Sequence, residues 1–174
     1  MSDRPVFTEN NRIFVSAGVL LYTKDTQGIY SFMMQKTQNR GSWIYEDLGG
    51  KSDPNDKSIK DVAFRECLEE LNFKGGITRD YLEQQLLDPH SITYSVVDNK
   101  YMLYIIYVPY EIKAKMNMNE FGDHELLDGV PRTVTWLSYR DFMSLDSKDL
   151  HPRFKPDELR DNLPLLIARN LIKN

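Results

Sequence analysis

The sequence has few of the features that mark exported, membrane-spanning or repetitive proteins. It contains a single cysteine, Cys67, so no disulfide can form within the chain. It has no run of about 18 apolar residues, and residues 1–11 are polar and charged where a secretory signal would be apolar. Repeats, low-complexity tracts and Gly/Ser-rich linkers are also missing. These absences favour a cytoplasmic protein that is not associated with a membrane.

Positive charge is not in excess either. The 22 Lys and Arg residues are outnumbered by 26 Asp and Glu residues, which gives a formal net charge of −4. No general attraction to nucleic acid or to an anionic membrane follows from this balance. A small anionic substrate would therefore need a bound cation to be held.

The overall composition is that of one folded domain with a sizeable core. Hydrophobic residues make up 41% of the 174 residues and charged residues 28%. We expect residues 1–11 to form an N-terminal tail and residues 12–174 to form a single domain.

Local patterns predict strand pairs around a central helix, with further helices near the end. Strands are expected over residues 13–23, 29–36, 91–97, 100–110 and 132–137. Helices are expected over residues 59–71, 138–143 and 156–172, the first with Ser58 as its N-cap. Loops are expected over residues 39–47 and 116–129. This order predicts an α/β (α+β) sandwich with a mixed sheet.

Three glutamates on the central helix are the most informative feature. Glu66, Glu69 and Glu70 are spaced i, i+3 and i+4, so their carboxylates project from one helical face. Like charges at this spacing repel by a few tenths of a kcal/mol per pair. A hard divalent cation such as Mg²⁺ or Mn²⁺ would compensate them. The alternative is a solvated acidic face with no ligand.

The segment from Gly50 to Phe73 resembles the Nudix box, G-x5-E-x7-R-E-U-x-E-E-x-G-U, in which U is a bulky apolar residue. Residues 65–70, Arg-Glu-Cys-Leu-Glu-Glu, match its R-E-U-x-E-E part at every position. Two departures stand out. The interval from Gly50 to the arginine is one residue longer than the pattern, and Asn72 replaces the second glycine. Either Asp56 or Lys57 therefore occupies the position of the early glutamate.

The similarity to the Nudix family extends beyond the box, over roughly residues 12–170. The order of elements follows that of the family: an initial strand pair, the box, a long strand, a loop over residues 116–129 that we call the acidic loop, and a strand ending in Trp136 and Leu137. Box and acidic loop together resemble the Nudix proteins of large DNA viruses. The resemblance implies a Nudix-like α/β/α sandwich.

The resemblance also implies a Mg²⁺-dependent (or Mn²⁺-dependent) hydrolase of phosphorus anhydride bonds. Its metal ligands would be Glu66, Glu69 and Glu70, with Asp56 as an outer ligand. Its catalytic residues would be Glu69, Arg65 and a general base from the acidic loop, with Glu125 as first candidate and Glu120 as second.

The box specifies the bond that is cleaved but not the group attached to it. Candidate substrate-binding residues are Gly50, Lys51, Trp43, Tyr45, Phe14 and Arg40. The expected substrate is a small nucleoside diphosphate derivative. The alternatives are capped RNA, a nucleoside triphosphate, or a Nudix module that senses a nucleotide without cleaving it. A homodimer is a further expectation carried by the family.

Overall fold

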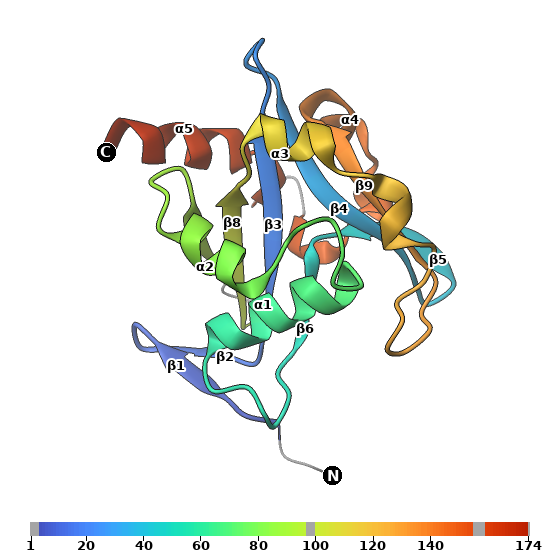
Figure 1. Cartoon of the computed structure of the whole chain (residues 1–174). Coiled ribbons are helices and arrows are strands. Elements are labelled where there is room, and N and C mark those ends of the chain that lie inside the picture. Colours follow the sequence, from blue (N-terminus) through green and yellow to red (C-terminus); the bar gives the residue numbers. More distant parts are fainter. Residues whose placement is uncertain (1–3, 97–99, 155–158, 174) are drawn as a thin grey trace.

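A mixed β-sheet lies between two layers of helices (Figure 1). The structure is a computed structural model that describes residues 4–96, 100–154 and 159–173. The main sheet has seven strands in the order β5–β4–β3–β8–β7, with β6 paired to β3 and β9 paired to β4. The strands are β3 (Ser16–Lys24), β4 (Tyr30–Asn39), β5 (Ser42–Glu46), β6 (Leu48–Lys51), β7 (Ile92–Val96), β8 (Tyr101–Tyr107) and β9 (Arg132–Ser138).

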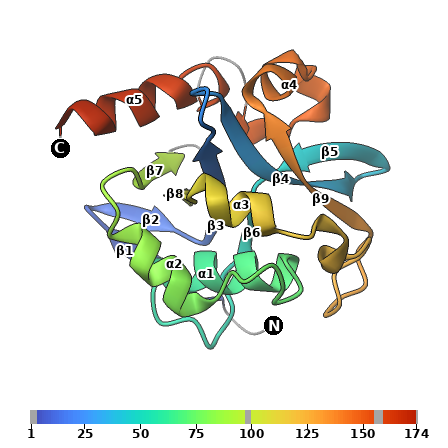
Figure 2. The same ribbon diagram turned by 45° about the horizontal axis from the view of Figure 1, so that its top comes forward.

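Helices cover both faces of this sheet. The α-helices are α1 (Ile59–Glu70), α2 (Arg79–Leu86), α3 (Tyr110–Lys115), α4 (Tyr139–Ser144) and α5 (Leu163–Lys173), and the 3-10 helices are η2 (Met118–Phe121), η3 (Ser147–Asp149) and η4 (Pro152–Phe154). Figure 2 shows α1 and α2 on one side of the sheet and α4 and α5 on the other. The predicted α/β (α+β) sandwich is therefore confirmed. No helix within the described ranges is long and apolar enough to cross a bilayer.

The parallel pair of β3 and β8 forms the centre of the sheet. Six of the seven residues of β8 are buried, as expected of a central strand. One half of β3 pairs with β4, where Tyr22 lies opposite Phe32, and the other half pairs with β6, where Gly18 lies opposite Gly49. Strand β6 in turn packs against α1. This arrangement brings Gly49 and Gly50 of β6 next to the helix that carries the glutamates.

Strand β5 corrects the prediction of a loop over residues 39–47. It pairs with β4 through a tight turn at Arg40 and Gly41, both of which have positive φ angles, 49° and 85°. Positive φ at two central residues is typical of a two-residue hairpin. The hairpin fixes which face of the sheet each β5 side chain occupies.

Two further elements differ from the prediction. Helix α2, which begins after Thr78, is not indicated by the sequence pattern. The expected tail contains strand β1 (Phe7–Glu9), which pairs with β2 (Arg12–Phe14). Helix α5 begins at Leu163. Residues 98–99, between two predicted strands, and the predicted helix start at residue 156 lie outside the described residues.

Helix α1 begins as predicted. The Ser58 side chain accepts a hydrogen bond from the backbone N–H of Asp61, which confirms Ser58 as the N-cap. The helix buries its apolar face against the sheet through Ile59, Val62, Ala63, Phe64 and Cys67. Glu66 and Glu69 lie on the opposite side, but Glu70 is itself buried, 9% exposed. A buried carboxylate needs partners, and the sheet supplies them.

Candidate active site

Arg65 gathers the carboxylates at the solvent-facing side of α1. Its Nη1 donates to both Glu66 Oε1 and Glu69 Oε2 at 2.9 Å, and its Nη2 donates to the Lys51 carbonyl oxygen at 2.9 Å. The guanidinium therefore links the helix to the end of β6. Arg65 and Glu69 are spaced i, i+4, which places the two side chains on neighbouring turns of the helix.

Asp56, and not Lys57, faces Arg65. The Asp56 carboxylate accepts from Arg65 Nε at 3.0 Å and from Arg65 Nη2 at 2.9 Å, and it also accepts from the Asp53 backbone N–H at 2.7 Å. The Asp56 backbone N–H donates to the Asp53 carbonyl oxygen at 3.0 Å, which closes a turn before the helix. Both Asp56 oxygens are thus engaged in holding Arg65, which leaves its predicted role as a cation ligand without support from the geometry.

Glu70 points into the sheet, where Gln35 of β4 binds it. Gln35 Nε2 donates to Glu70 Oε1 at 2.9 Å and lies 3.4 Å from Glu46 Oε1 on β5. Burial, together with the charges of Glu125, Glu46 and Glu66, raises the pKa of Glu70 to about 8, against the lowering effect of the hydrogen bond from Gln35. Burial likewise raises the pKa of Glu46 to about 7. Sequence patterns do not indicate Gln35 or Glu46, because only the strand register brings them under α1.

The acidic loop brings Glu125 to the same carboxylates. Burial raises the pKa of Glu125 to about 7, together with the charge and hydrogen bond of Asp128 and the charges of Glu66 and Glu69. Glu120 instead lies on η2 and lines a separate pocket with Gly75 and Gly76, beyond the end of α1. Of the two loop candidates for a general base, the structure therefore places Glu125 at the site.

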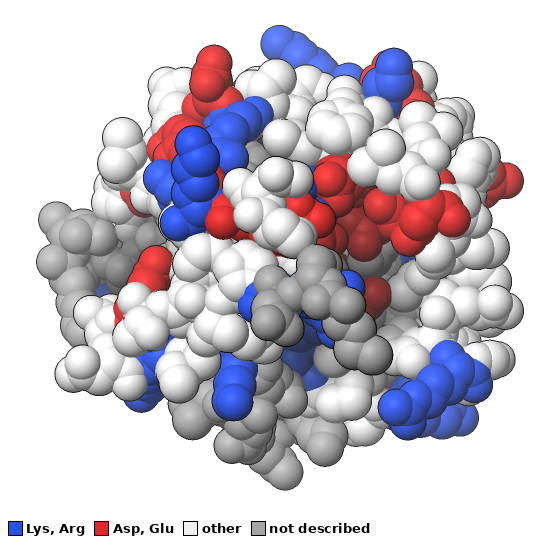
Figure 3. Space-filling view, turned by 90° about the horizontal axis from the view of Figure 1, so that it is seen from below, with Lys and Arg blue, Asp and Glu red and all other residues white. Residues whose placement is uncertain are grey.

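Gly50 and Lys51 border the carboxylates of α1. A Cβ atom on Gly50 would collide with the Glu66 carboxylate, so a glycine is required where β6 passes the helix. Lys51, Arg65 and Glu66 line a polar pocket of about 360 Å³ together with Arg4. Figure 3 shows acidic side chains gathered around a hollow on the lower side of the molecule, where α1 lies in Figure 1.

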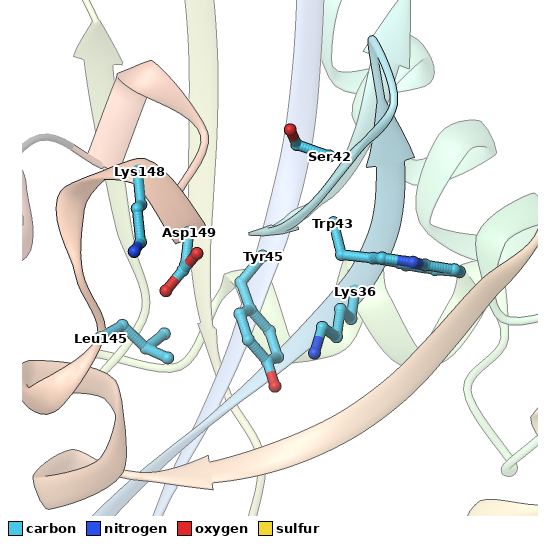
Figure 4. Close-up of a pocket in the computed structure, with 7 residues that line it drawn as sticks. All are labelled: Lys36, Ser42, Trp43, Tyr45, Leu145, Lys148 and Asp149. Atoms are coloured by element: carbon cyan, nitrogen blue, oxygen red, sulfur yellow. The ribbon is translucent and has the colours of Figure 1, made fainter.

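Trp43 and Tyr45 lie on the other face of the sheet. Side chains alternate along a strand, and Tyr45 is paired with Lys36 next to the pair of Glu46 and Gln35 that faces α1. Trp43 and Tyr45 line a pocket of about 570 Å³ with Lys36, Ser42, Leu145, Lys148 and Asp149 (Figure 4). The structure does not bring these two aromatics to the carboxylates.

Two other predicted substrate-binding residues are also remote from the glutamates. Phe14 is 2% exposed and belongs to the core beneath α1, where no ligand can stack on it. Arg40 lies at the tip of the β4–β5 turn and lines a pocket with His151 and Lys148. Arg40, Trp43 and Tyr45 all belong to the β4–β5 hairpin, and the pairing of β5 with β4 explains why they lie away from the glutamates.

Comparison with known proteins identifies this arrangement of elements. No family model and no curated protein matches the sequence. The structure of RenU, a Nudix hydrolase from M. smegmatis, is similar with a TM-score of 0.53 at 16% identity, covering 94% of this chain and 95% of that chain. The chain has the Nudix fold. At this identity the similarity establishes the fold alone.

Other solved structures with the Nudix fold are similar at lower scores. A binary complex of a C. elegans Ap4A hydrolase gives a TM-score of 0.48 at 17% identity, over 91% of this chain and 96% of that chain. The Nudix domain of Shewanella oneidensis NrtR, complexed with ADP ribose, gives a TM-score of 0.49 at 15% identity, over 91% and 88%.

The side chains of this Nudix fold suit a hard divalent cation in their chemistry. Among the described residues, no three Asp, Glu, His or Cys groups already form a cation cage. The carboxylates of Glu66 and Glu69 form ion pairs with Arg65 instead. The available donors are all carboxylate oxygens, the ligands that Mg²⁺ prefers. Burial and neighbouring negative charges raise the pKa of Glu66 and Glu70. A bound cation would lower both pKa values, because an opposite charge favours the ionised carboxylate.

A buried ion network holds the residues that precede β6. Arg153 of η4 donates to Asp47 Oδ1 at 2.5 Å and to Glu46 Oε2 at 3.2 Å, and its guanidinium lies 4.4 Å from the centre of the Tyr101 ring. The Tyr101 hydroxyl donates to the other Asp47 oxygen. A Cβ atom at Gly49 would collide with that hydroxyl. The network therefore ties the C-terminal segment to β6, and the sequence gives no signal for it.

Removing Arg153 should destabilise the fold. Arg153→Met would leave the Asp47 carboxylate buried without its cation, and we expect a loss of about 3 kcal/mol in the free energy of unfolding. Arg140→Met, at an exposed position of α4, is the control and should change it by less than about 0.5 kcal/mol. Urea unfolding measures both variants. Similar small changes in the two would show that the network adds little.

Proposed function

We propose that the chain is a Mg²⁺-dependent pyrophosphohydrolase that acts on a nucleoside diphosphate linked to another group. The observation that carries this proposal is the convergence of Glu66, Glu69, Glu70 and Glu125 from α1 and the acidic loop. Burial and neighbouring negative charges raise the pKa of Glu66, Glu70 and Glu125. A solvated acidic face would not show such pKa shifts, because exposed carboxylates are screened by water. Perturbed carboxylates gathered in one place are typical of functional sites.

Each residue has a distinct part in the proposed reaction. Glu66, Glu69 and Glu70 would hold the cation, which neutralises pyrophosphate charge and favours attack by water. Arg65 orients Glu69 from the side and attaches the helix to β6. Glu125 accepts the proton of the attacking water. Lys51 binds a phosphate oxygen from the polar pocket beside Glu66.

The geometry favours an enzyme over a module that only senses a nucleotide. The sensor hypothesis rests on the additional residue between Gly50 and Arg65. Despite that residue, Asp56 binds Arg65 through both oxygens, and Arg65 binds Glu66 and Glu69. The altered spacing therefore leaves the carboxylates of α1 in place, which weakens the argument for a non-catalytic module.

A small substrate fits the charge distribution better than a long RNA. Lys51 and Arg4 provide positive charge within the pocket of about 360 Å³ beside the carboxylates. That volume accommodates a pyrophosphate and part of a nucleoside. A polynucleotide would need an extended basic surface, and a net charge of −4 does not favour such a surface.

A substrate panel tests this proposal. Purified protein and Mg²⁺ are incubated with ADP-ribose, nucleotide sugars, dinucleoside polyphosphates, nucleoside triphosphates and capped RNA, and the products are separated by chromatography. We expect cleavage of a nucleoside diphosphate derivative that the double variant Glu69→Gln, Glu70→Gln reduces at least about a thousandfold. Glu111→Gln, at an exposed position of α3, is the matched control. Nucleotide binding without cleavage of any substrate would support a sensor instead.

A further inference from the structure

Asn72 stands where the Nudix box has its second glycine, directly after α1. Its φ angle is 51°, in the left-handed region that glycine and asparagine tolerate best. A glycine would satisfy the backbone equally well. Yet the Asn72 side chain is not solvated, because the residue is only 6% exposed. A buried amide requires hydrogen-bond partners, and those partners reveal what the side chain does.

All of these partners belong to the acidic loop. Asn72 Nδ2 donates to the Phe121 carbonyl oxygen at 2.8 Å and to the His124 carbonyl oxygen at 3.0 Å. Its Oδ1 accepts from the Leu126 backbone N–H at 2.9 Å. One side chain thus binds the residue before Glu125 and the residue after it. The carboxylate of Glu125 extends from the backbone segment that this amide holds.

Other contacts fix the base of the loop, and backbone hydrogen bonds from Glu125 to Val130 and from Arg132 to Asp123 close the loop on itself. Arg132 Nη1 donates to the carbonyl oxygens of Phe121 and Gly122 at 2.8 and 3.2 Å. The Phe121 ring packs so tightly on Gly75 that a Cβ atom there would collide with it. Within the described residues, Asn72 is the only side chain from outside the loop that hydrogen-bonds to His124 or Leu126.

We propose that Asn72 is a positioning residue that sets Glu125 against the carboxylates of α1. The amide joins the end of the carboxylate helix to the loop that carries the general base, so the two parts of the site keep a fixed separation. Because the base must be placed to within a fraction of an ångström, a loosened loop lowers the rate without removing any reacting group. This inference rests on the proposed function for its catalytic part but not for its structural part.

Amide hydrogen exchange tests the structural part without any substrate. In Asn72→Gly the backbone keeps a residue that accepts φ of 51° and loses only the amide. We expect the Leu126 N–H to exchange at least about tenfold faster, while the N–H groups of α1 are unchanged. Asn10→Gly is the control, because Asn10 also has positive φ, 49°, but lies in the β1–β2 turn. Unchanged exchange at Leu126 in Asn72→Gly would overturn the proposal.

Kinetics in two backgrounds test the catalytic part. We expect Asn72→Gly to lower kcat about tenfold with KM changed less than about twofold, because position and not substrate binding is lost. In a Glu125→Gln background the same substitution should lower kcat less than about twofold, since there is no base left to position. Equal losses in both backgrounds would show that Asn72 acts on the fold and not through Glu125.

A substitution that keeps the shape of the Asn72 side chain tests the role of its hydrogen-bond donor. Asn72→Asp retains the acceptor for the Leu126 N–H but replaces the donor with an oxygen that faces two carbonyl groups. We expect it to impair kcat more than Asn72→Gly does, and a smaller effect would contradict the role of the donor. If the wild-type protein hydrolyses no substrate of the panel, the proposed function fails, and the exchange experiment alone decides whether Asn72 holds the loop.

Discussion

Glu125→Gln should lower kcat about a hundredfold for the substrate identified from the panel, because a glutamine cannot accept the proton of the attacking water. The pKa of Glu125 is raised to about 7, and the base acts in its ionised form. The wild-type rate should therefore rise with pH up to about pH 7. A cation bound nearby would lower that pKa and shift the rise to lower pH. The pH dependence should be lost in the variant.

Steady-state kinetics over a pH series measure this effect, with Glu111→Gln as the matched control. The glutamine preserves the size of the side chain, so the loop should remain in place. A larger loss in Glu120→Gln than in Glu125→Gln would assign the base to the other loop carboxylate and contradict the placement of Glu120 beyond the end of α1.

Metal-free protein should lose stability as the pH rises from about 5 to about 8. The pKa of Glu70 is about 8 in the folded protein and 4.5 in its ordinary state, so the folded form binds the proton more tightly. The stabilisation from that proton is complete below about pH 4.5 and is lost as the pH rises through about 8. Glu70→Gln is neutral at all pH values and should show a flatter profile of melting temperature.

Mg²⁺ should reverse this loss. A cation that binds the ionised carboxylates stabilises the folded state by mass action, so it should raise the melting temperature more at about pH 8 than at about pH 5. The difference between wild type and Glu70→Gln isolates Glu70 from other titrating groups. An equal rise in both proteins, or one that is independent of pH, would contradict a role for Glu70 as a ligand.

The helix that carries the glutamates is well predicted from sequence because its determinants are local. Ser58 caps the helix, and the spacing of Glu66 and Glu69 follows from 3.6 residues per turn. The strand pairs on either side follow from apolar runs and turn residues. The fold class could be predicted for the same reason, since the order of elements restricts how they can pack.

The parts of the site that depend on strand register could not be predicted. Residues 39–47 contain a short strand that resembles a loop in composition, so the alternation that turns Trp43 and Tyr45 away from α1 was not apparent. The same register brings Gln35 and Glu46 under Glu70.

Long-range contacts were equally hidden. Asn72 and Arg153 each act on residues about 50 or more positions away, and nothing in their neighbouring sequence indicates those partners. The sequence also could not decide between Asp56 and Lys57, because only the folded turn at Asp53 shows which of them reaches Arg65.

The most direct test of the central claim is a Mn²⁺ titration followed by electron paramagnetic resonance, comparing wild type with the double variant Glu69→Gln, Glu70→Gln. Mn²⁺ accepts the same oxygen ligands as Mg²⁺. The carboxylates of α1 should bind Mn²⁺ in the wild type, and the double variant should lose at least about a hundredfold in affinity. Equal affinity in the two proteins would show that the glutamates of α1 do not form the cation site.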